Sequence, residues 1–383
     1  MTWEKVRLGD VCKYVTSGGT PLASRADFYN PGTIPWLKTK EVNYSRITET
    51  ENYISELGLA NSSAKLIPAD SVIVAMYGQG DTAGRVAINK IPLCTNQACC
   101  NLVIDEKKAD FEFIYYNLCT LYNKLVSLKN GGAQPNLNAG LIKNLEISVP
   151  SLKTQKRIAD ILSAYDDLIE NNQKQIKLLE EAAQRLYKQW FIDLKFPGHE
   201  TTKIVDGLPE GWRRDCVGNL IKKIERTKQI EAKDYLLEGK IPVIDQSRNF
   251  IAGYTDDLDS AVKESCPVIV FGDHTRILKY IQFPFAKGAD GTQLIVSNIA
   301  CMPQSLFYCS LVNVDLSNYH YARHFKYLKA EEIVVPDVHT ANKFDKIAKE
   351  FFAKIQNCRC QISSSQKSRN RLLPKLMNCE LEI

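Results

Sequence analysis

Short turns of this sequence carry side chains that could recognise the edges of nucleic-acid bases. Arg, Lys, His, Asn, Gln, Ser and Thr can exchange hydrogen bonds with base edges, and each base pair shows a distinct donor and acceptor pattern in the major groove. In the first half of the chain these candidates are Lys38, Thr39, Lys40, Gln79, Thr82, Gln134 and Asn136. In the second half they are Gln246, Ser247, Arg248, Asn249, His274, Thr275, Arg276, Arg323, His324 and Lys326. Any one of them could be an ordinary solvated loop residue. The hypothesis that they recognise DNA therefore rests on their clustering in short turns of both halves of the chain.

The motifs of common nucleotide-dependent and DNA-modifying enzymes are missing. The run from Gly78 to Gly84 has the form GxGxxxG, but a strand-like R-V-A-I-N-K follows it, where a dinucleotide site needs a helix N-terminus. There is no Walker-type phosphate loop and no Pro-Pro dipeptide, which the flipped-base motif of an adenine methyltransferase requires. Asp105 and Glu106 are expected in a solvated turn rather than a nuclease site. We therefore expect a non-catalytic protein.

Neither the cysteines nor the histidines show the spacing of a metal site. The twelve cysteines include no CxxC pair, and the five histidines are scattered. We predict reduced, mostly buried thiols and no metal. No apolar run approaches the length of a membrane span, and the N-terminal M-T-W-E-K-V-R-L-G-D does not resemble a targeting segment. A cytoplasmic location is the default expectation.

The net charge of +5 does not by itself identify a DNA-binding domain. The two segments expected to be globular are nearly balanced, whereas residues 337–383 hold nine basic against five acidic side chains. Any DNA footprint must therefore come from local clustering of charge.

A long helix is predicted between Ser151 and Trp190, because this stretch has neither Gly nor Pro and repeats its apolar residues in alternating steps of four and three. Such a heptad seam predicts a coiled coil. The seam is Ile158, Leu162, Tyr165, Ile169, Asn172, Ile176, Leu179, Ala183, Leu186 and Trp190. Asn172 would fix the register at some loss of stability. The alternative is a long core helix without a special role.

A second, weaker seam supplies the partner helix in the same chain. Its positions are Phe344, Ile347, Phe351, Ile355, Cys358, Ile362, Ser365, Arg369, Leu372 and Leu376. Pro374 is expected to end or kink this helix.

The segments before the two helices are similar enough to predict an internal repeat. Trp3–Gly9 is echoed by Trp212–Gly218, and further short echoes follow in the same order, including the sequence Ile-Pro at 34 and 241 and Val-Ile-Val at 72 and 268. We therefore predict an α+β fold of two tandem mixed α/β domains separated by two long antiparallel helices, with pseudo-two-fold symmetry. Two unrelated domains with chance echoes are the alternative.

Several motifs, in order, resemble one family. They are G-G-A-Q-P-N-L-N (131–138), I-S-V-P-S-L-K-T-Q-K-R-I-A-D-I-L (147–162), L-E-E-A-A-Q-R-L-Y-K-Q-W-F (179–191), K-F-P-G (195–198), L-P-E-G-W (208–212) and L-L-P-K-L-M (372–377). Together they resemble the specificity subunit of Type I restriction-modification systems. The second half departs from the pattern, because the P-S-L-K-T-Q stretch from Pro150 has no clean match at Pro336.

The resemblance implies four segments: recognition domains at 1–150 and 201–336, and spacer helices at 151–200 and 337–383. Each domain would read one half of a split DNA sequence, while the coiled coil would set the gap and dock two modification subunits. Restriction subunits would complete the assembly. S-adenosylmethionine, ATP and Mg²⁺ would be bound by those partners and not by this chain.

A second hypothesis is a solitary coiled-coil scaffold whose domains bind proteins instead of specific DNA. Steep salt dependence and a sequence-specific footprint would separate the two hypotheses, because a protein scaffold should show neither.

Overall fold

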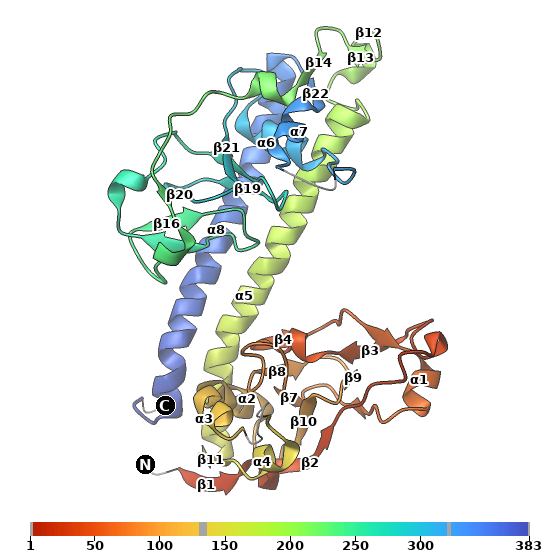
Figure 1. Cartoon of the computed structure of the whole chain (residues 1–383), viewed down its shortest axis with the longest axis vertical. Helices are drawn as coiled ribbons and strands as arrows, with labels where there is room; N and C mark the ends of the chain where they lie inside the picture. Colours follow the sequence, from red (N-terminus) through yellow and green to blue (C-terminus); the bar gives the residue numbers. More distant parts are fainter. Residues whose placement is uncertain (1–2, 130–135, 320–322, 382–383) are drawn as a thin grey trace. The chain divides into compact units, whose positions relative to one another are not determined.

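The computed structural model describes residues 3–129, 136–319 and 323–381. Its contacts divide the chain into two compact units, Met1–Glu170 with Ser363–Ile383 and Asn171–Ile362. Both units contain part of the two long helices, α5 (Leu152–Tyr187) and α8 (Val338–Met377). Strands of each half of the chain are grouped around these helices (Figure 1).

The first unit is built on two larger sheets and one strand pair. The pair joins β1 (Glu4–Arg7) to β11 (Glu146–Val149). The five-stranded sheet has the order β2 (Cys12–Ser17), β10 (Cys99–Ile104), β7 (Val72–Ala75), β8 (Val86–Asn89) and β4 (Ser45–Ile47). The four-stranded sheet has the order β5 (Tyr53–Ile54), β3 (Ile34–Leu37), β9 (Leu93–Thr95) and β6 (Leu66–Ile67). Its helices are α1 (Glu56–Ala60), α2 (Phe111–Thr120), α3 (Tyr122–Ser127) and α4 (Ala139–Lys143).

The central strands of this unit are buried along their whole length. Every residue of β7, β8 and β10 is buried, and apart from Asn89 and Asn101 their sequences are apolar, since a strand covered on both faces loses the usual alternation. Phe113 and Ile114 of α2 belong to the core on one side of this sheet, and Leu37 and Val42 to a smaller cluster around Ile73. The sheet therefore holds the turns at its strand ends on a rigid base.

The second unit repeats these elements. A pair joins β14 (Arg213–Cys216) to β22 (Glu332–Val335). A three-stranded sheet has the order β19 (Leu278–Ile281), β18 (Val268–Gly272) and β21 (Thr292–Ile295). A four-stranded sheet has the order β15 (Gln229–Ile230), β20 (Ala286–Gly288), β16 (Ile241–Ile244) and β17 (Gly253–Thr255). A small hairpin of β12 (Ile204–Val205) and β13 (Leu208–Pro209), and the helices α6 (Gln304–Val312) and α7 (Phe325–Ala330), complete it.

The strand pairings agree with the repeat that the sequence predicts. The parallel pair β3 and β9 corresponds to the parallel pair β16 and β20. The antiparallel strand β7 between β8 and β10 corresponds to β18 between β19 and β21. β1 in the first unit and β14 in the second each pair with the strand directly before a long helix, β11 and β22 respectively. The predicted α+β fold with two long helices packed together is confirmed.

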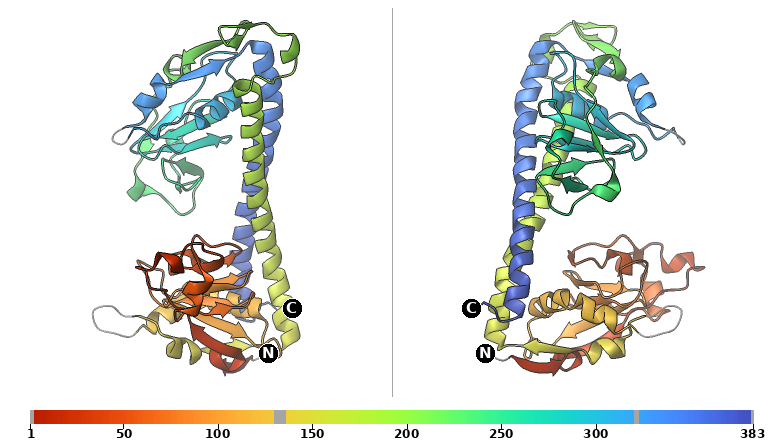
Figure 2. Two further views of the ribbon diagram at one scale, coloured as in Figure 1. Left: turned by 90° about the vertical axis from the view of Figure 1, so that its right-hand side faces the viewer. Right: turned by 60° about the vertical axis from the view of Figure 1, so that its left-hand side comes forward.

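The two long helices pair in opposite directions inside each unit. In the first unit, Ile158 and Leu162 from the start of α5 share a core with Leu376 from the end of α8. In the second unit, Tyr187 near the end of α5 lies against Phe344 near the start of α8. Figure 2 shows the paired helix segments side by side within each unit. The pairing is therefore antiparallel.

The buried positions of α5 follow the predicted seam. Ile158, Leu162, Ile169 and Asn172 are buried, and Tyr165, Ile176, Leu179 and Leu186 are half-buried. The amide Nδ2 of Asn172 has no hydrogen-bond partner among the described residues. A buried amide without a partner lowers stability, and the role of Asn172 in setting the register stays a prediction.

The first half of α8 differs from the predicted seam. Ile355 and Leu376 are buried and Phe351, Ile362 and Leu372 half-buried, but Ile347 is 39% exposed. Ala348 and Phe352 are buried in its place, because this stretch packs against the domain core, where the ring of Phe352 lies 4.4 Å from that of Tyr280. Pro374 does not end α8, which continues to Met377.

Candidate nucleic-acid interface

Three turns of the first unit are connected by main-chain hydrogen bonds at one set of strand ends. The turn after β9 joins the end of β3 through Asn96 N–H to Leu37 O (2.9 Å). The same turn joins the end of β7 through Met76 N–H to Ala98 O (2.8 Å). Leu137 N–H then donates to Met76 O (3.1 Å). The predicted reading residues after β3, after β7 and before α4 therefore occupy neighbouring segments.

The residues after β3 form a short 3-10 turn at Thr39–Glu41. Lys38 is half-buried, with its Nζ 3.0 Å from Asn52 Oδ1 and 5.0 Å from the centroid of the Trp36 ring. Thr39 is half-buried, and Lys40 is exposed in an ion pair with Glu51. Solvent-exposed pairs of this kind contribute little and exchange readily, so Lys40 remains available to a phosphate or a base.

The glycine-rich turn between β7 and β8 projects Gln79 into solvent. Thr82 fastens the turn by donating from its backbone N–H (3.3 Å) and its hydroxyl (2.7 Å) to Gln79 O. Gly80 has φ +61°, and a Cβ placed there would meet no atom within 4 Å. The left-handed backbone conformation at residue 80 therefore favours glycine, and the space beside it is open to a ligand.

Asn136 is exposed and directly precedes Leu137, which anchors this segment beside β7. Gln134, the other candidate of the amide-rich loop, lies outside the described residues.

Sequence reasoning missed the turn between β9 and β10. Gln97 is exposed there and accepts a hydrogen bond from the hydroxyl of Thr20, which is also exposed. Asn96 lies between this pair and the end of β3. A polar Asn-Gln pair directly after a buried strand was the available signal, and it has the same form as the signals that identified the other turns.

In the second unit, the matching turns after β16 and after β18 touch each other. Gln246 Oε1 accepts from the backbone N–H of His274 (3.1 Å), and Gln246 O accepts from the hydroxyl of Thr275 (2.6 Å). Gly291, after β20, completes the group: it has φ +67°, and a Cβ there would lie 2.7 Å from His274 Cδ2 and 2.8 Å from the Gln246 amide. His274 and Thr275 are exposed, and Gln246 is half-buried.

Lys279 stabilises the turn after β16 through hydrogen bonds to its backbone. Its side chain is only 4% exposed, and its Nζ donates to Asp245 O (2.8 Å) and Asn249 O (2.5 Å). Burial lowers the pKa of Lys279 to about 8, although Asp245 opposes the shift. Ser247 is held by Asp245 Oδ1. Arg248 and Asn249 remain exposed at the tip of the turn.

Arg276 and His324 interact with each other. Arg276 Nε donates to His324 Nε2 (3.3 Å), and its other nitrogens donate to Leu316 O (3.0 Å) and Tyr319 O (3.2 Å). His324 is 5% exposed, and its burial lowers its pKa. This pair therefore shapes the loop, whereas Arg323 and Lys326 beside it are exposed.

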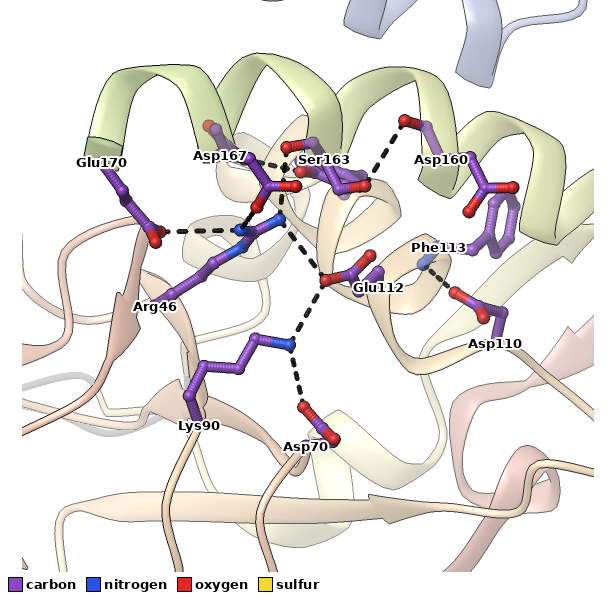
Figure 3. A network of polar contacts seen from close by, with 12 residues as sticks. Arg46, Asp70, Lys90, Asp110, Glu112, Phe113, Asp160, Ser163, Asp167 and Glu170 are labelled. Atoms are coloured by element: carbon purple, nitrogen blue, oxygen red, sulfur yellow. Dashed lines mark hydrogen bonds and ion pairs between the residues drawn. The ribbon is translucent and has the colours of Figure 1, made fainter. Parts of the chain in front are cut away.

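A polar network fixes the first domain on its helix. Figure 3 shows Arg46 of β4 extending towards Glu112 of α2 and towards Asp167 and Glu170 of α5. Arg46 pairs with Asp167, and its nitrogens lie 3.4 Å from Glu112 Oε1 and 3.7 Å from Glu170 Oε1. Burial opposes the charge on Arg46, but the hydrogen bond to Asp167 and the nearby carboxylates raise its pKa above the ordinary value.

Buried and half-buried polar pairs also join the two helices. In the first unit, Asp166 of α5 pairs with Arg369 of α8 and accepts from the Tyr116 hydroxyl (2.5 Å). In the second unit, Arg359 of α8 lies 3.1 Å from Glu180 Oε1 of α5 and 3.7 Å from the centroid of the Phe250 ring. Because Phe250 follows Asn249, this contact also supports the turn after β16, which the sequence predicts to read bases.

Within residues 3–129, 136–319 and 323–381, no group of three or more His, Cys, Asp or Glu is placed to hold a metal ion. In the same part of the chain, no helix combines the length and the apolar content needed to cross a bilayer.

Comparison with known proteins identifies the family. Residues 1–181 match the model of the Type I restriction modification DNA specificity domain. Over its full length, the chain is 27% identical to the specificity subunit of the Type I restriction enzyme MjaIX from Methanocaldococcus jannaschii, of which 94% is covered. The EcoR124I/EcoR124II specificity subunit from Escherichia coli is 30% identical over 199 residues, which are 51% of this chain and 48% of that protein.

The fold has a counterpart among solved structures. The crystal structure of the Type I restriction-modification S subunit from M. genitalium superposes with a TM-score of 0.64 at 18% identity, covering 98% of this chain and 96% of that one. The family match, the full-length relative and the shared fold agree with one another. Residues 1–181 therefore carry the DNA specificity domain of Type I restriction-modification systems, and the whole chain is similar in sequence and in fold to the specificity subunits of those systems.

Proposed function

We propose that each unit reads one half of a two-part DNA sequence through its polar turns. The repetition of these turns carries the proposal: exposed amides, hydroxyls and cations follow the corresponding strands β3 and β16, and β7 and β18. Thr20 and Gln97 extend the predicted set in the first unit. Arg276 and His324 act as supports of the loop, because they bind each other.

The helices α5 and α8 set the unspecified gap in this proposal and dock two modification subunits. The apolar side chain of Ile347 on α8, which is 39% exposed, supports the docking. Together with the half-buried Phe351 and the buried Trp190, it lines a cavity of about 520 Å³ on the second unit. Apolar side chains that the chain itself leaves uncovered commonly mark a protein interface.

The reactions belong to the partners. Modification subunits with S-adenosylmethionine would methylate adenine, and restriction subunits with ATP and Mg²⁺ would cleave DNA. The family resemblance supports these assignments and a cytoplasmic location, where such partners meet the DNA.

A map of N6-methyladenine tests the function directly. We would compare cells that carry this chain and its modification subunit with cells that lack only this chain. The expected difference is one motif of two halves with a fixed gap, and exchange of residues 1–150 for those of a relative should change one half alone. Identical maps from a folded, expressed chain would contradict the proposal and favour the protein-binding scaffold.

Single substitutions test the reading turns. Gln79→Ala and Gln97→Ala should relax selection at one base of the first half-site by about 1–3 kcal/mol and leave the second half unchanged. Lys107→Ala is the matched control, because Lys107 is exposed in the turn after β10 and apart from these turns. Unchanged selection in both glutamine variants would exclude these turns from base reading.

A further inference from the structure

The second unit contains a cavity of about 520 Å³ that the reading turns do not explain. Its walls are the segment 221–229, the strands β20 and β21, and Phe325 of α7. Three cations line it, Lys222, Arg226 and Lys287. The one carboxylate of the lining, Glu225, is paired with Lys263 (3.1 Å) outside it.

Two of these cations have no counter-ion in the part of the chain that the structure describes. Lys222 pairs with Glu264 (2.8 Å), but neither Arg226 nor Lys287 has an ion pair or side-chain hydrogen bond within the described residues. Lys287 is half-buried, and this burial lowers its pKa. A cation that is removed from water without a partner destabilises the fold, so its retention points to an anion that arrives from outside.

Uncharged donors complete the lining. The hydroxyl oxygen of Thr227 is buried and has no hydrogen-bond partner among the described residues. Gln293 also lines the cavity. Cations together with hydroxyl and amide donors are the groups that proteins use to hold phosphate oxygens of DNA.

The cavity adjoins the reading turns of the same unit. Lys287 pairs with Ile244 of β16, two residues before Gln246. The turn after β20 leads to Gly291, whose backbone lies against His274 and Gln246. A DNA strand held in the cavity would therefore continue past the turns that read bases.

We propose that this cavity binds a phosphodiester group of the DNA backbone beside the second half-site. The proposal rests on the DNA-reading function proposed above. The cavity would position the duplex without selecting its sequence, because phosphates carry no direct sequence information.

The test uses the full chain and two duplexes, one with the methylated motif and one scrambled, and measures binding against salt concentration. Lys287→Met and Arg226→Gln should each reduce the slope of log K against log salt by about 1, and weaken both duplexes by the same factor. The control is Lys233→Met, which removes one exposed cation of the same unit outside the cavity, and it should leave the slope unchanged.

Thermal unfolding supplies a second readout. Lys287→Met should unfold at the same or a higher temperature, because it removes an unpaired, half-buried charge. Unchanged slopes in both cavity variants overturn the proposal, and so does a weakening confined to the motif duplex. If the wild-type chain binds both duplexes equally, the base-reading proposal fails instead, while the slopes still decide whether phosphate binds in the cavity.

Discussion

Replacement of Arg46 tests whether the polar network of Figure 3 holds the first domain on α5. The Arg46 side chain is 7% exposed and lies among three carboxylates, those of Glu112, Asp167 and Glu170. Arg46→Met keeps an unbranched apolar stem in the same space but removes the charge and every hydrogen bond of the guanidinium. The three carboxylates then repel one another, although Glu112 keeps its pair with Lys90, whose Nζ lies 3.4 Å from Glu112 Oε1.

The expected loss follows from how exposed the partners are. Breaking a fully buried ion pair lowers stability by about 3–5 kcal/mol, whereas an exposed pair is worth at most about 1 kcal/mol. Asp167 is 68% exposed and Glu170 32%, so water can solvate both after the change, but Glu112 is only 17% exposed. We therefore expect Arg46→Met to lower the free energy of unfolding by about 2–3 kcal/mol, between the two limits.

Urea unfolding followed by circular dichroism measures this loss. Arg46→Lys should recover only part of it, because an ammonium cannot contact several carboxylates with the fixed fork of a guanidinium. Lys13→Met is the control, since Lys13 forms an exposed pair with Glu106 and should change stability by less than about 1 kcal/mol. If Arg46→Met costs no more than Lys13→Met, the network does not stabilise the domain and the reasoning is refuted.

Three further predictions follow from other sites. The pKa of Lys279 is about 8 in the folded chain and 10.5 ordinarily, so between these pH values the unfolded chain binds more protons than the folded one. The free energy of unfolding of the wild type should therefore rise with pH relative to that of Lys279→Met. Urea unfolding from pH 7 to 10 checks the sign. Gly18→Ala places a Cβ 2.1 Å from Thr95 O and should cost about 3 kcal/mol, against about 1 kcal/mol for Gly80→Ala, whose Cβ meets nothing; thermal unfolding compares the two. Asp337, the residue before α8, accepts hydrogen bonds from Trp212 and Thr340, which lower its pKa although burial opposes the shift. Asp337→Ala should therefore cost about 1 kcal/mol at pH 7, and its stability difference from wild type, measured by urea unfolding, should vanish as the pH falls below 3.8.

The starts of the two long helices are more alike than their sequences suggest. The stretch from Pro336 lacks the P-S-L-K-T-Q pattern, yet Asp337 bonds Thr340 as Ser151 bonds Thr154 at the start of α5. An oxygen-bearing side chain three residues before a threonine satisfies free N–H groups of the first turn in both cases. A comparison of residue types missed this match, because Ser and Asp are different residues whose side-chain oxygens accept the same hydrogen bond.

The long helices, the repeat and most of the polar turns proposed to read bases could be predicted from the amino-acid sequence alone. Helical periodicity and strand-like apolar runs are local properties, and they remain visible whatever the chain packs against. The seam from Ile158 to Leu186 could be predicted in this way, because its alternating steps of four and three are visible in the sequence itself. Polar residues soon after buried strands marked the turns at Lys38 and Gln246, and the glycine run from Gly78 marked the turn at Gln79, for the same local reason.

Which faces and side chains of these elements are buried became visible only in the folded chain. Ala348 and Phe352 are buried instead of Ile347 because the start of α8 meets a domain core as well as a helix. Arg276 binds His324, which is 48 residues away along the chain, and this pairing cannot be read from either residue alone. Burial and charge pairing depend on groups that meet only in the folded chain, so periodicity can place an element but cannot choose its partners.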